Sequence, residues 1–360
     1  MAVASPVALV FSSAYALAAS QLPVHQDREC MTFSLLQHLG LLGNMHVVAP
    51  TPATVADLSW FHSSRYIAAL QTAEALSRDE ELEFGLTDDA YVFPRLFEYC
   101  TYVAGASITA AALLSGADRR VDVAIHWGGG RHHAMKDRAS GFCYVNDVVL
   151  AVETLLRKSP DAKVVVFDID IHHGDGVESA FYYSSRVFTV SFHKFARGFF
   201  PNSGAPTRIG AGPGKYWNLN VPLDDGITDE QYAPAMESWR SYQPSDPLGT
   251  FNLTATGIGW CLQVLQEMDK PLLLLGGGGY NAADAARTFA HLTATILGVD
   301  ESYTSAIPEH DFYDRYGPHF TMKTTASVAR RNKNTVASLE ATCKEALRHL
   351  DRAEEATSSS

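Results

Sequence analysis

Five short apolar runs, each followed by glycines or polar residues, restrict the fold of this chain more than any other feature. They occupy residues 7–11, 121–125, 163–167, 187–192 and 271–275. Near-continuous apolar strands are typical of burial on both faces, which occurs in mainly parallel sheets. Helical patterns lie between them, most clearly at 109–114, 146–156 and 282–297. The alternation predicts an α/β fold with a mainly parallel central sheet.

The chain is expected to form one large domain, residues 1–330, followed by a C-terminal helix and a disordered serine tail in residues 331–360. Strand and helix patterns alternate along its whole length, and no internal repeat or linker interrupts them. Asn146 or Asp147 is expected to cap the second helix, and Asn281 the third.

Charge and cysteine content exclude some classes of protein. The formal net charge of −12 argues against direct nucleic-acid binding, which needs a basic surface, and is compatible with a cationic partner. The five cysteines are scattered without a CxxC pair, so free thiols are expected. Residues 3–19 lack a basic start and are interpreted as a strand and loop rather than a signal peptide. No run of 18 apolar residues predicts a membrane span.

Acidic residues and histidines cluster where the third apolar run ends. Asp168, Asp170 and His172 alternate there, and side chains two apart in a strand share a face. Carboxylate oxygen and imidazole nitrogen suit a divalent cation, so this strand end is a candidate metal site. A structural salt-bridge cluster is the alternative. Ligands of open parallel sheets bind at the carboxyl ends of the strands, where this cluster lies.

Two further strand ends carry candidate catalytic groups. His132 and His133 follow a glycine-rich turn, and acids such as Asp168 and Asp175 could orient their rings. Taken alone, the pair could equally be a surface loop. Tyr280 follows four glycines, and its hydroxyl could stabilise an oxyanion. That glycine run lacks the Lys-Ser/Thr of a P-loop and the GxGxxG spacing, so nucleotide binding is not expected.

Together these segments resemble the class I histone deacetylases, over roughly Val7 to Tyr316. The resemblance rests on five motifs, at residues 131–134, 140–147, 168–176, 193–195 and 276–281. It implies an arginase/deacetylase-like three-layer fold and hydrolysis of Nε-acetyl-lysine by a water bound to Zn²⁺ or Fe²⁺. The catalytic residues that it implies are His132, His133, Tyr280, Asp168 and Asp175, and the metal ligands are Asp170 and His172.

The resemblance also implies roles for other residues. Asp168 would pair with His132, and Asp175 with His133, which would act as general base and acid. Arg28 would lie at an internal channel for acetate release. The substrate site would consist of Asp89, Gly141, Phe142, Phe200 and Leu248. A structural K⁺ would be bound by Asp168, Asp170, His172, Ser191 and Phe192.

The chain departs from the family pattern in two places. The family has a third metal ligand, an Asp at the end of a strand before the sequence that matches residues 246–252. Here roughly 18 residues with that strand are missing, which leaves two of the three protein ligands that catalytic zinc normally has. Asp246 is a candidate substitute. In addition, Arg131 replaces a residue that is usually hydrophobic and introduces a charge near the acetate cavity.

Three functions therefore remain open. The first is an active deacetylase of acetylated histone tails or other acetyl-lysine proteins, a chromatin and transcription regulator in nucleus and cytoplasm. The second is a catalytically weak or inactive form that acts by binding, which the missing ligand would favour. The third is an acetylpolyamine-type amidohydrolase, against which Asp89 argues because it fits a peptide substrate better. The oligomeric state is left open.

Overall fold

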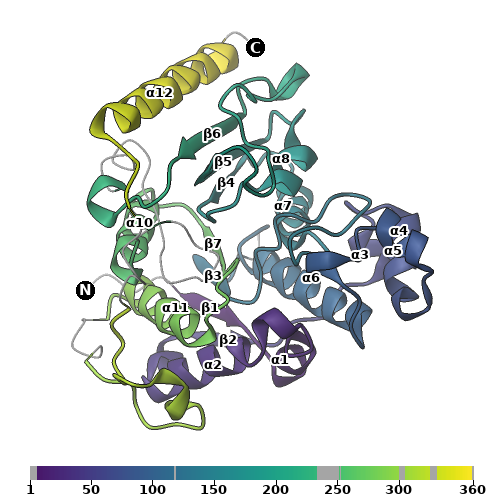
Figure 1. Ribbon diagram of the computed structural model, residues 1–360, viewed down its shortest axis with the longest axis vertical. Coiled ribbons are helices and arrows are strands. Elements are labelled where there is room, and N and C mark those ends of the chain that lie inside the picture. The colour runs from purple at the N-terminus through teal and green to yellow at the C-terminus, as the bar shows by residue number, and fades with distance from the viewer. Residues whose placement is uncertain are drawn as a thin grey trace. The chain divides into compact units, whose positions relative to one another are not determined.

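The computed structural model describes residues 6–116, 119–232, 251, 253–299, 305–324 and 331–358. The chain forms two compact units, Met1–Asp161 with Leu265–Lys323, and Ala162–Val264 with Thr324–Ser360 (Figure 1). Each unit contains a parallel sheet with flanking helices, so the predicted α/β class is confirmed. Each unit is described by itself below.

The sheet of the first unit contains four parallel strands. Its order is β2 (His46–Val48), β1 (Val7–Val10), β3 (Val123–His126) and β7 (Leu272–Leu275). Ala124 pairs with Ala8 on one side and with Leu273 on the other. Since the strands run parallel, their carboxyl ends share one edge, and both glycine-rich loops start there.

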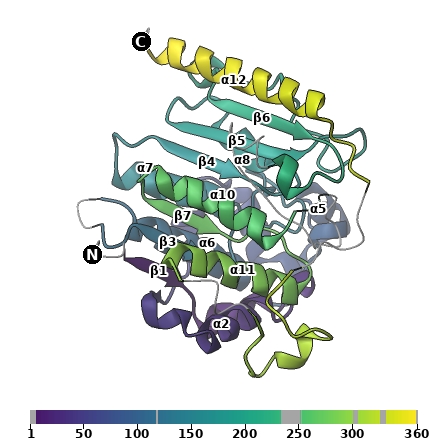
Figure 2. The ribbon, with the colours of Figure 1, turned by 90° about the vertical axis from the view of Figure 1, so that its left-hand side faces the viewer.

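Helices cover both faces of this sheet (Figure 2). One face, which includes Ala8 and Ala124, packs in one hydrophobic cluster with Ala106 and Ala110 of α6 (Leu96–Leu113). Leu9 on the other face lines a small cavity together with Thr32 and Leu36 of α2 (Arg28–His38). The remaining helices of this unit are α1 (Ser13–Ala19), α2 (Arg28–His38), α3 (Val55–Leu58), α4 (Ser64–Gln71), α5 (Arg78–Glu83), α7 (Asp147–Lys158), α11 (Ala282–Leu297) and the 3₁₀ helices Pro23–His25, Leu41–Asn44, Ala73–Ala75, Asp88–Ala90 and Tyr313–Tyr316.

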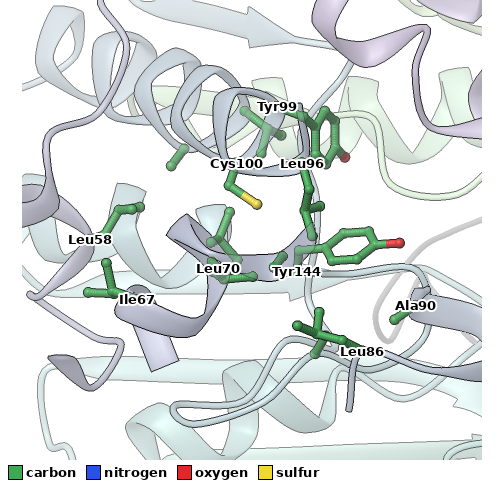
Figure 3. Packing of buried hydrophobic residues seen from close by; sticks show 14 of the residues in the cluster. Leu58, Ile67, Leu70, Leu86, Ala90, Leu96, Tyr99, Cys100 and Tyr144 are labelled. Atoms are coloured by element: carbon green, nitrogen blue, oxygen red, sulfur yellow. The ribbon is translucent and has the colours of Figure 1, made fainter. Parts of the chain in front are cut away.

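The main core of the first unit lies around α6 (Figure 3). Leu96, Tyr99 and Cys100 of this helix pack with Leu70 of α4 and with Tyr144. Of the described helices, α6 alone has the length and apolar composition to cross a membrane, but 56% of it is buried inside the protein, as in a core helix. The predicted caps are confirmed: Asn146 Oδ1 accepts a hydrogen bond from Val149 N, and Asn281 Oδ1 from Asp284 N.

The second unit contains a three-stranded parallel sheet. Its order is β4 (Val164–Asp168), β5 (Val187–Lys194) and β6 (Asn218–Leu223). Its helices are α8 (Asp175–Phe181), the first part of α10 (Ala255–Glu267), α12 (Val336–Ser358) and the 3₁₀ helix Gly212–Gly214. Phe192 and Val190 of β5 pack with Leu219 of β6, with Leu339 of α12 and with Cys261 of α10 in one cluster.

The described residues thus form two parallel sheets instead of one continuous sheet. Among the described strands, β4 pairs with β5 alone and β7 with β3 alone, so both are edge strands. Their side chains are only partly buried, and Val165 of β4 is 62% exposed, whereas β1 and β3 are buried throughout.

Candidate active site

The loop after β3 places His132 and His133 in the interior of the first unit. Both side chains are buried, and their ring centroids lie 4.0 Å apart. The alternative of a surface loop is therefore wrong for this pair. Buried polar groups are hydrogen-bonded in most proteins. The backbone of the loop that carries these two histidines is hydrogen-bonded as well.

Two residues at the start of α7 hold this loop in place. The Asp147 carboxylate accepts hydrogen bonds from Gly130 N at 3.0 Å and Arg131 N at 2.6 Å. Asn146 Nδ2 donates to the carbonyl oxygens of His132 and Ala134, at 3.2 and 2.9 Å. Burial raises the pKa of Asp147, although the hydrogen bonds from Ser107 and Arg131 oppose this shift. The backbone that carries both histidines is fixed from outside the motif that contains them.

Glycines let the loops after β3 and β7 touch backbone to backbone. Gly277 N donates to Gly129 O at 2.8 Å. Gly130 has φ +91°, and a Cβ there would lie 2.5 Å from Gly277 N, so no other residue fits without a shift. At Gly276 a Cβ would collide with the Trp127 carbonyl. These glycines therefore permit the close approach of one loop to the other.

Four residues predicted for the tyrosine and substrate positions lie together in the first unit. The Tyr280 ring is partly buried and meets the Phe142 ring at 5.3 Å, edge to face. Gly141, next to Phe142, donates a backbone hydrogen bond to Asp89, which opposes the rise that burial causes in the pKa of this carboxyl group. Phe142 has φ +59°, an unusual conformation for an aromatic residue that turns this segment sharply.

Arg28 supports the glycine loop from the inner side. Its Nη1 donates to Gly277 O at 3.1 Å and to Gly278 O at 2.6 Å, and its Nη2 pairs with Glu29 at 3.0 Å. The guanidinium is almost wholly buried. Arg28 therefore positions the loop that presents Tyr280.

The acid and histidine cluster of the second unit lies just beyond β4 rather than within it. The strand ends at Asp168, so the expected strand alternation through His172 is wrong. Instead, Asp168 Oδ1 accepts from Asp170 N at 3.0 Å, and Asp170 Oδ1 accepts from His172 N at 2.9 Å. Short aspartate side chains compete in this way for nearby backbone amides and end strands.

These turns bring two metal donors together. Asp170 Oδ1 and His172 Nδ1 are 3.2 Å apart. Two ligands of one tetrahedral zinc lie about 3.3 Å apart, given Zn–O and Zn–N lengths near 2.0–2.1 Å. The pair therefore has a spacing that would suit two zinc ligands, but the same contact is a hydrogen bond between the side chains, as the salt-bridge alternative predicts. Phe199 is stacked on the His172 ring at 5.1 Å, and Phe200 lies at its edge. Within the described ranges, no group of three His, Cys, Asp or Glu side chains could hold a metal.

Three of the residues expected for K⁺ lie on neighbouring strands, whereas Asp170 and His172 lie beyond the end of β4. Asp168 of β4 is in register with Ser191 of β5, and Phe192 follows Ser191. Asp168 and Ser191 line a cavity of about 10 Å³ together with His173 and Glu178, which is near the minimum for one water. Burial opposes the ionisation of Glu178, but hydrogen bonds from His173, Asn220 and Arg208 lower its pKa to about 2.

The other predicted residues are more widely distributed. Asp175 is the first residue of α8. Asp246 and Leu248 lie outside the described residues. The predicted Asp168–His132 and Asp175–His133 pairs join residues of the two units, and they stay predictions.

Comparison with known proteins identifies the family. Residues 22–296 match the histone deacetylase domain. The chain belongs to the histone deacetylase family. This family consists of hydrolases that act on amide bonds and are generally metal-dependent. Since the match extends from Leu22 to Ile296, it includes the histidine pair, the aspartate and histidine cluster and Tyr280.

Individual histone deacetylases are similar over most of the chain. Histone deacetylase 8 of Danio rerio is 39% identical over 358 residues, covering 93% of this chain and 92% of the relative. Histone deacetylase 19 of Arabidopsis thaliana is 40% identical, covering 93% and 70%. Histone deacetylase 8 of Xenopus tropicalis is 41% identical over 321 residues, covering 83% and 85%. Similarity to histone deacetylase 8, predicted from Phe199-Phe200-Pro201 and residues 307–310, is confirmed.

The alignments also contain residues that this chain lacks. The Danio rerio alignment is 358 positions long but covers 93% of the 360 residues here, so this chain has no residue at about 23 aligned positions. The Xenopus tropicalis alignment gives about 22. These totals are close to the shortening that the motif spacing predicts before Asp246.

Sequence reasoning missed three residues with a role in this arrangement. Asp147 and Asn146 were expected to act only as helix caps, and His25 had no expected role. The His25 ring lies 5.5 Å from the Tyr280 ring, and its Nδ1 contacts Arg131. A signal existed for Asp147, since it closes the motif at residues 140–147. His25 lies 255 residues from Tyr280 in the chain, and no local pattern connects the two.

Proposed function

We propose that this chain is a metal-dependent lysine deacetylase that hydrolyses Nε-acetyl-lysine on histone tails or other proteins. The observation that carries the proposal is the buried histidine pair, which is fixed by Asp147 and Asn146 in contact with the glycine loop of Tyr280. Class I deacetylation also implies a role in chromatin and transcription regulation, in nucleus and cytoplasm, and a catalytic domain at 1–330 followed by the C-terminal helix.

Different residues of this chain would have different roles in the hydrolysis. Asp170 and His172 would hold Zn²⁺ or Fe²⁺, and the chemistry that a bound divalent ion supplies is Lewis acidity. His133 would accept the proton of the attacking water and later deliver it to the lysine nitrogen, with His132 beside it. The Tyr280 hydroxyl would donate a hydrogen bond to the developing oxyanion. A K⁺ near Asp168 and Ser191 would neutralise part of the buried negative charge.

Substrate recognition is proposed for the group around Phe142. Phe142 and Gly141 would line the passage for the acetyl-lysine side chain, and Phe200 would take the corresponding place beside His172. Asp89 would accept hydrogen bonds from the peptide backbone at the rim. A peptide backbone offers successive amide donors to one carboxylate, whereas an acetylated polyamine offers one amide and its ammonium groups, so Asp89 is proposed to suit a protein substrate better.

The experiment combines turnover with metal content. The purified chain is assayed with an acetyl-lysine peptide and an acetylated polyamine, and bound metal is measured by plasma mass spectrometry. Peptide turnover that depends on added Zn²⁺ or Fe²⁺ is the expected result. Full metal content without turnover of either substrate would contradict the proposal.

A catalytically weak form that acts by binding is the second candidate. Two observations favour it: two metal donors are present among the described residues, and about 23 aligned positions are missing relative to the Danio rerio protein. Two protein ligands bind zinc more weakly than three and leave the attacking water poorly placed. Acetyl-lysine peptide binding that persists without added metal, with turnover absent at saturating Zn²⁺, would select this candidate.

A further inference from the structure

Four buried polar side chains form one chain of hydrogen bonds that ends at the loop of the histidine pair. They belong to α1, α6, β3 and α7 of the first unit (Figure 1). Tyr15 Oη lies 3.1 Å from His126 Nε2, and His126 Nδ1 lies 2.8 Å from Ser107 Oγ. The Ser107 hydroxyl in turn donates to Asp147 Oδ2. None of the four is more than 1% exposed, so bulk water offers none of them a substitute partner.

Two glycines of the histidine loop leave the space that these side chains occupy. A Cβ at Gly129 would lie within 2.9 Å of three polar atoms, which are Asp147 Oδ2, His126 Nδ1 and Ser107 Oγ. A Cβ at Gly128 would lie 1.7 Å from the Tyr15 hydroxyl oxygen. The small size of both loop residues is therefore required by the polar side chains that lie against them.

The direction of these hydrogen bonds follows from the Asp147 carboxylate. It accepts from two backbone amides of the loop, which can only donate, and from the Ser107 hydroxyl. Because serine has one hydroxyl proton and gives it to Asp147, Ser107 Oγ must accept from His126 Nδ1. The proton of His126 is therefore on Nδ1, and Nε2 accepts from the Tyr15 hydroxyl.

The neutral state of His126 makes this order of bonds strict. Burial, together with the charges of Arg131 and Arg28, lowers the pKa of His126 to about 3, so the ring has a single proton. The reverse order would need a protonated Asp147, a Ser107 hydroxyl that donates to His126, and a proton on Nε2. The tautomer of His126 therefore reports the direction of the whole chain of bonds.

His126 also fixes the rotation of the Ser107 hydroxyl. A serine within a helix readily donates to the carbonyl four residues earlier, because its hydroxyl rotates freely. The bond from His126 Nδ1 occupies one side of Ser107 Oγ and favours the orientation in which the hydroxyl proton points at Asp147. A buried carboxylate depends on such donors, so loss of the His126 donor would weaken the hold of Asp147 on the histidine loop.

We infer that His126 is a positioning residue for the catalytic histidines, and that it acts through Ser107 and Asp147. This inference rests on the proposed function for the role of the histidine pair. In this role His126 touches neither the substrate nor the reacting atoms, and it keeps the backbone of the pair in one place. Its loss should therefore lower kcat and leave KM nearly unchanged.

The tautomer of His126 is measured without turnover. The full chain is labelled with ¹⁵N-histidine, and long-range ¹H–¹⁵N correlation spectra identify the protonated nitrogen of each ring. The spectrum of His126→Asn assigns the signals of His126 by their loss. A proton on Nδ1 is the expected result. A proton on Nε2 would overturn the inference, because the ring would then be unable to donate to Ser107.

Two substitutions separate hydrogen bonding from packing. His126→Asn retains a donor, since its amide nitrogen can take the place of Nδ1, whereas His126→Leu fills the space without one. His126→Leu should lower kcat for an acetyl-lysine peptide about ten- to a hundredfold, the value of a hydrogen bond to a charged group. His126→Asn should recover most of this loss. His46→Leu and His46→Asn, at an exposed histidine of β2, are the matched controls.

The outcomes separate this role from the proposed function. If His126→Leu turns over the peptide at least as fast as His126→Asn, packing alone accounts for His126 and the inference is overturned. If the wild type is inactive, the proposed function is contradicted, and amide exchange of residues 128–133 decides whether His126 holds the loop. His126→Leu should then exchange faster than His126→Asn, and equal exchange would overturn the inference. If His126→Leu fails to fold, the tautomer in the wild type decides.

Discussion

The Tyr280 side chain is positioned by several successive contacts, the first of which are hydrogen bonds to the backbone of its loop. Arg28 holds the glycine loop, the loop touches the backbone of Gly129, and the Tyr280 ring packs against Phe142. Each contact limits the freedom of the ring before any substrate binds. The role proposed for the Tyr280 hydroxyl is that of a preorganised donor, which stabilises an oxyanion without further rearrangement and is costly to remove.

Tyr280→Phe should therefore lower kcat for an acetyl-lysine peptide about a hundred- to a thousandfold and leave KM nearly unchanged. The ring still packs on Phe142, so folding should be unaffected. Steady-state kinetics measure the effect, and Tyr183→Phe, at a residue 69% exposed, is the control. A loss confined to KM would show that the hydroxyl acts in binding only.

Asp147→Asn should lower the free energy of unfolding by about 1–3 kcal/mol, because an amide cannot accept from all the donors that now face the carboxylate. Turnover should fall as well, since the same backbone carries His132 and His133. Urea unfolding and peptide turnover are the measurements, with Asp161→Asn on the exposed surface as control. Unchanged stability would mean that Asp147 is not needed to hold the loop.

At the scale of elements, β4 and β7 are the weak points of the molecule. Both have the composition of fully buried strands, yet each is an edge strand whose side chains are only partly covered in the described structure. Apolar edge strands pair readily with other chains and promote aggregation. We therefore expect the shortening predicted before Asp246 to lower stability as well as metal binding.

Motif spacing predicts the shortening before Asp246, and insertion there of the corresponding Danio rerio segment should correct both defects. We expect less aggregation, a higher urea midpoint, and zinc content rising toward one per chain, because a third ligand completes the tetrahedral set. An insertion of equal length composed of glycine and serine is the control. If both insertions have the same effect, the strand and its ligand are not what the chain lacks.

The sequence predicts the strands and the site loops well because their signals are local. Apolar runs locate β1, β3, β4, β5 and β7 to within a few residues, and Asn146 and Asn281 cap helices as expected. Sequence patterns fail where side chains compete for local backbone amides, and where the arrangement depends on distant residues. The turns at Asp168 and Asp170 replaced the expected strand alternation, and the contact of Arg131 with His25 joins residues 106 apart.

At the scale of the whole molecule, buried neutral histidines make folding sensitive to acid. Burial lowers the pKa of His62 to about 4, and those of His126 and His193 to about 3. In the unfolded chain a histidine titrates near 6.5, so below that pH the unfolded state binds protons that the folded state does not. Their contribution to stability is complete above about pH 6.5 and decreases as pH falls toward 4.

The free energy of unfolding should therefore fall between pH 6.5 and 4 by about 1.4 kcal/mol per pH unit for each of the three histidines. Since domains are stable by only about 5–15 kcal/mol, the chain should unfold before pH 4. Two carboxyl groups also contribute below about pH 4.5. Glu178, with its lowered pKa, makes stability fall further as pH falls, whereas Asp147, with its raised pKa, makes it fall less.

Urea midpoints at constant ionic strength measure the slope of stability against pH. His62→Gln should reduce the slope by about 1.4 kcal/mol per pH unit, and His319→Gln, at an exposed position, should not. A midpoint that is constant from pH 6.5 to 4.5 would show that the buried histidines gain protons in the folded state.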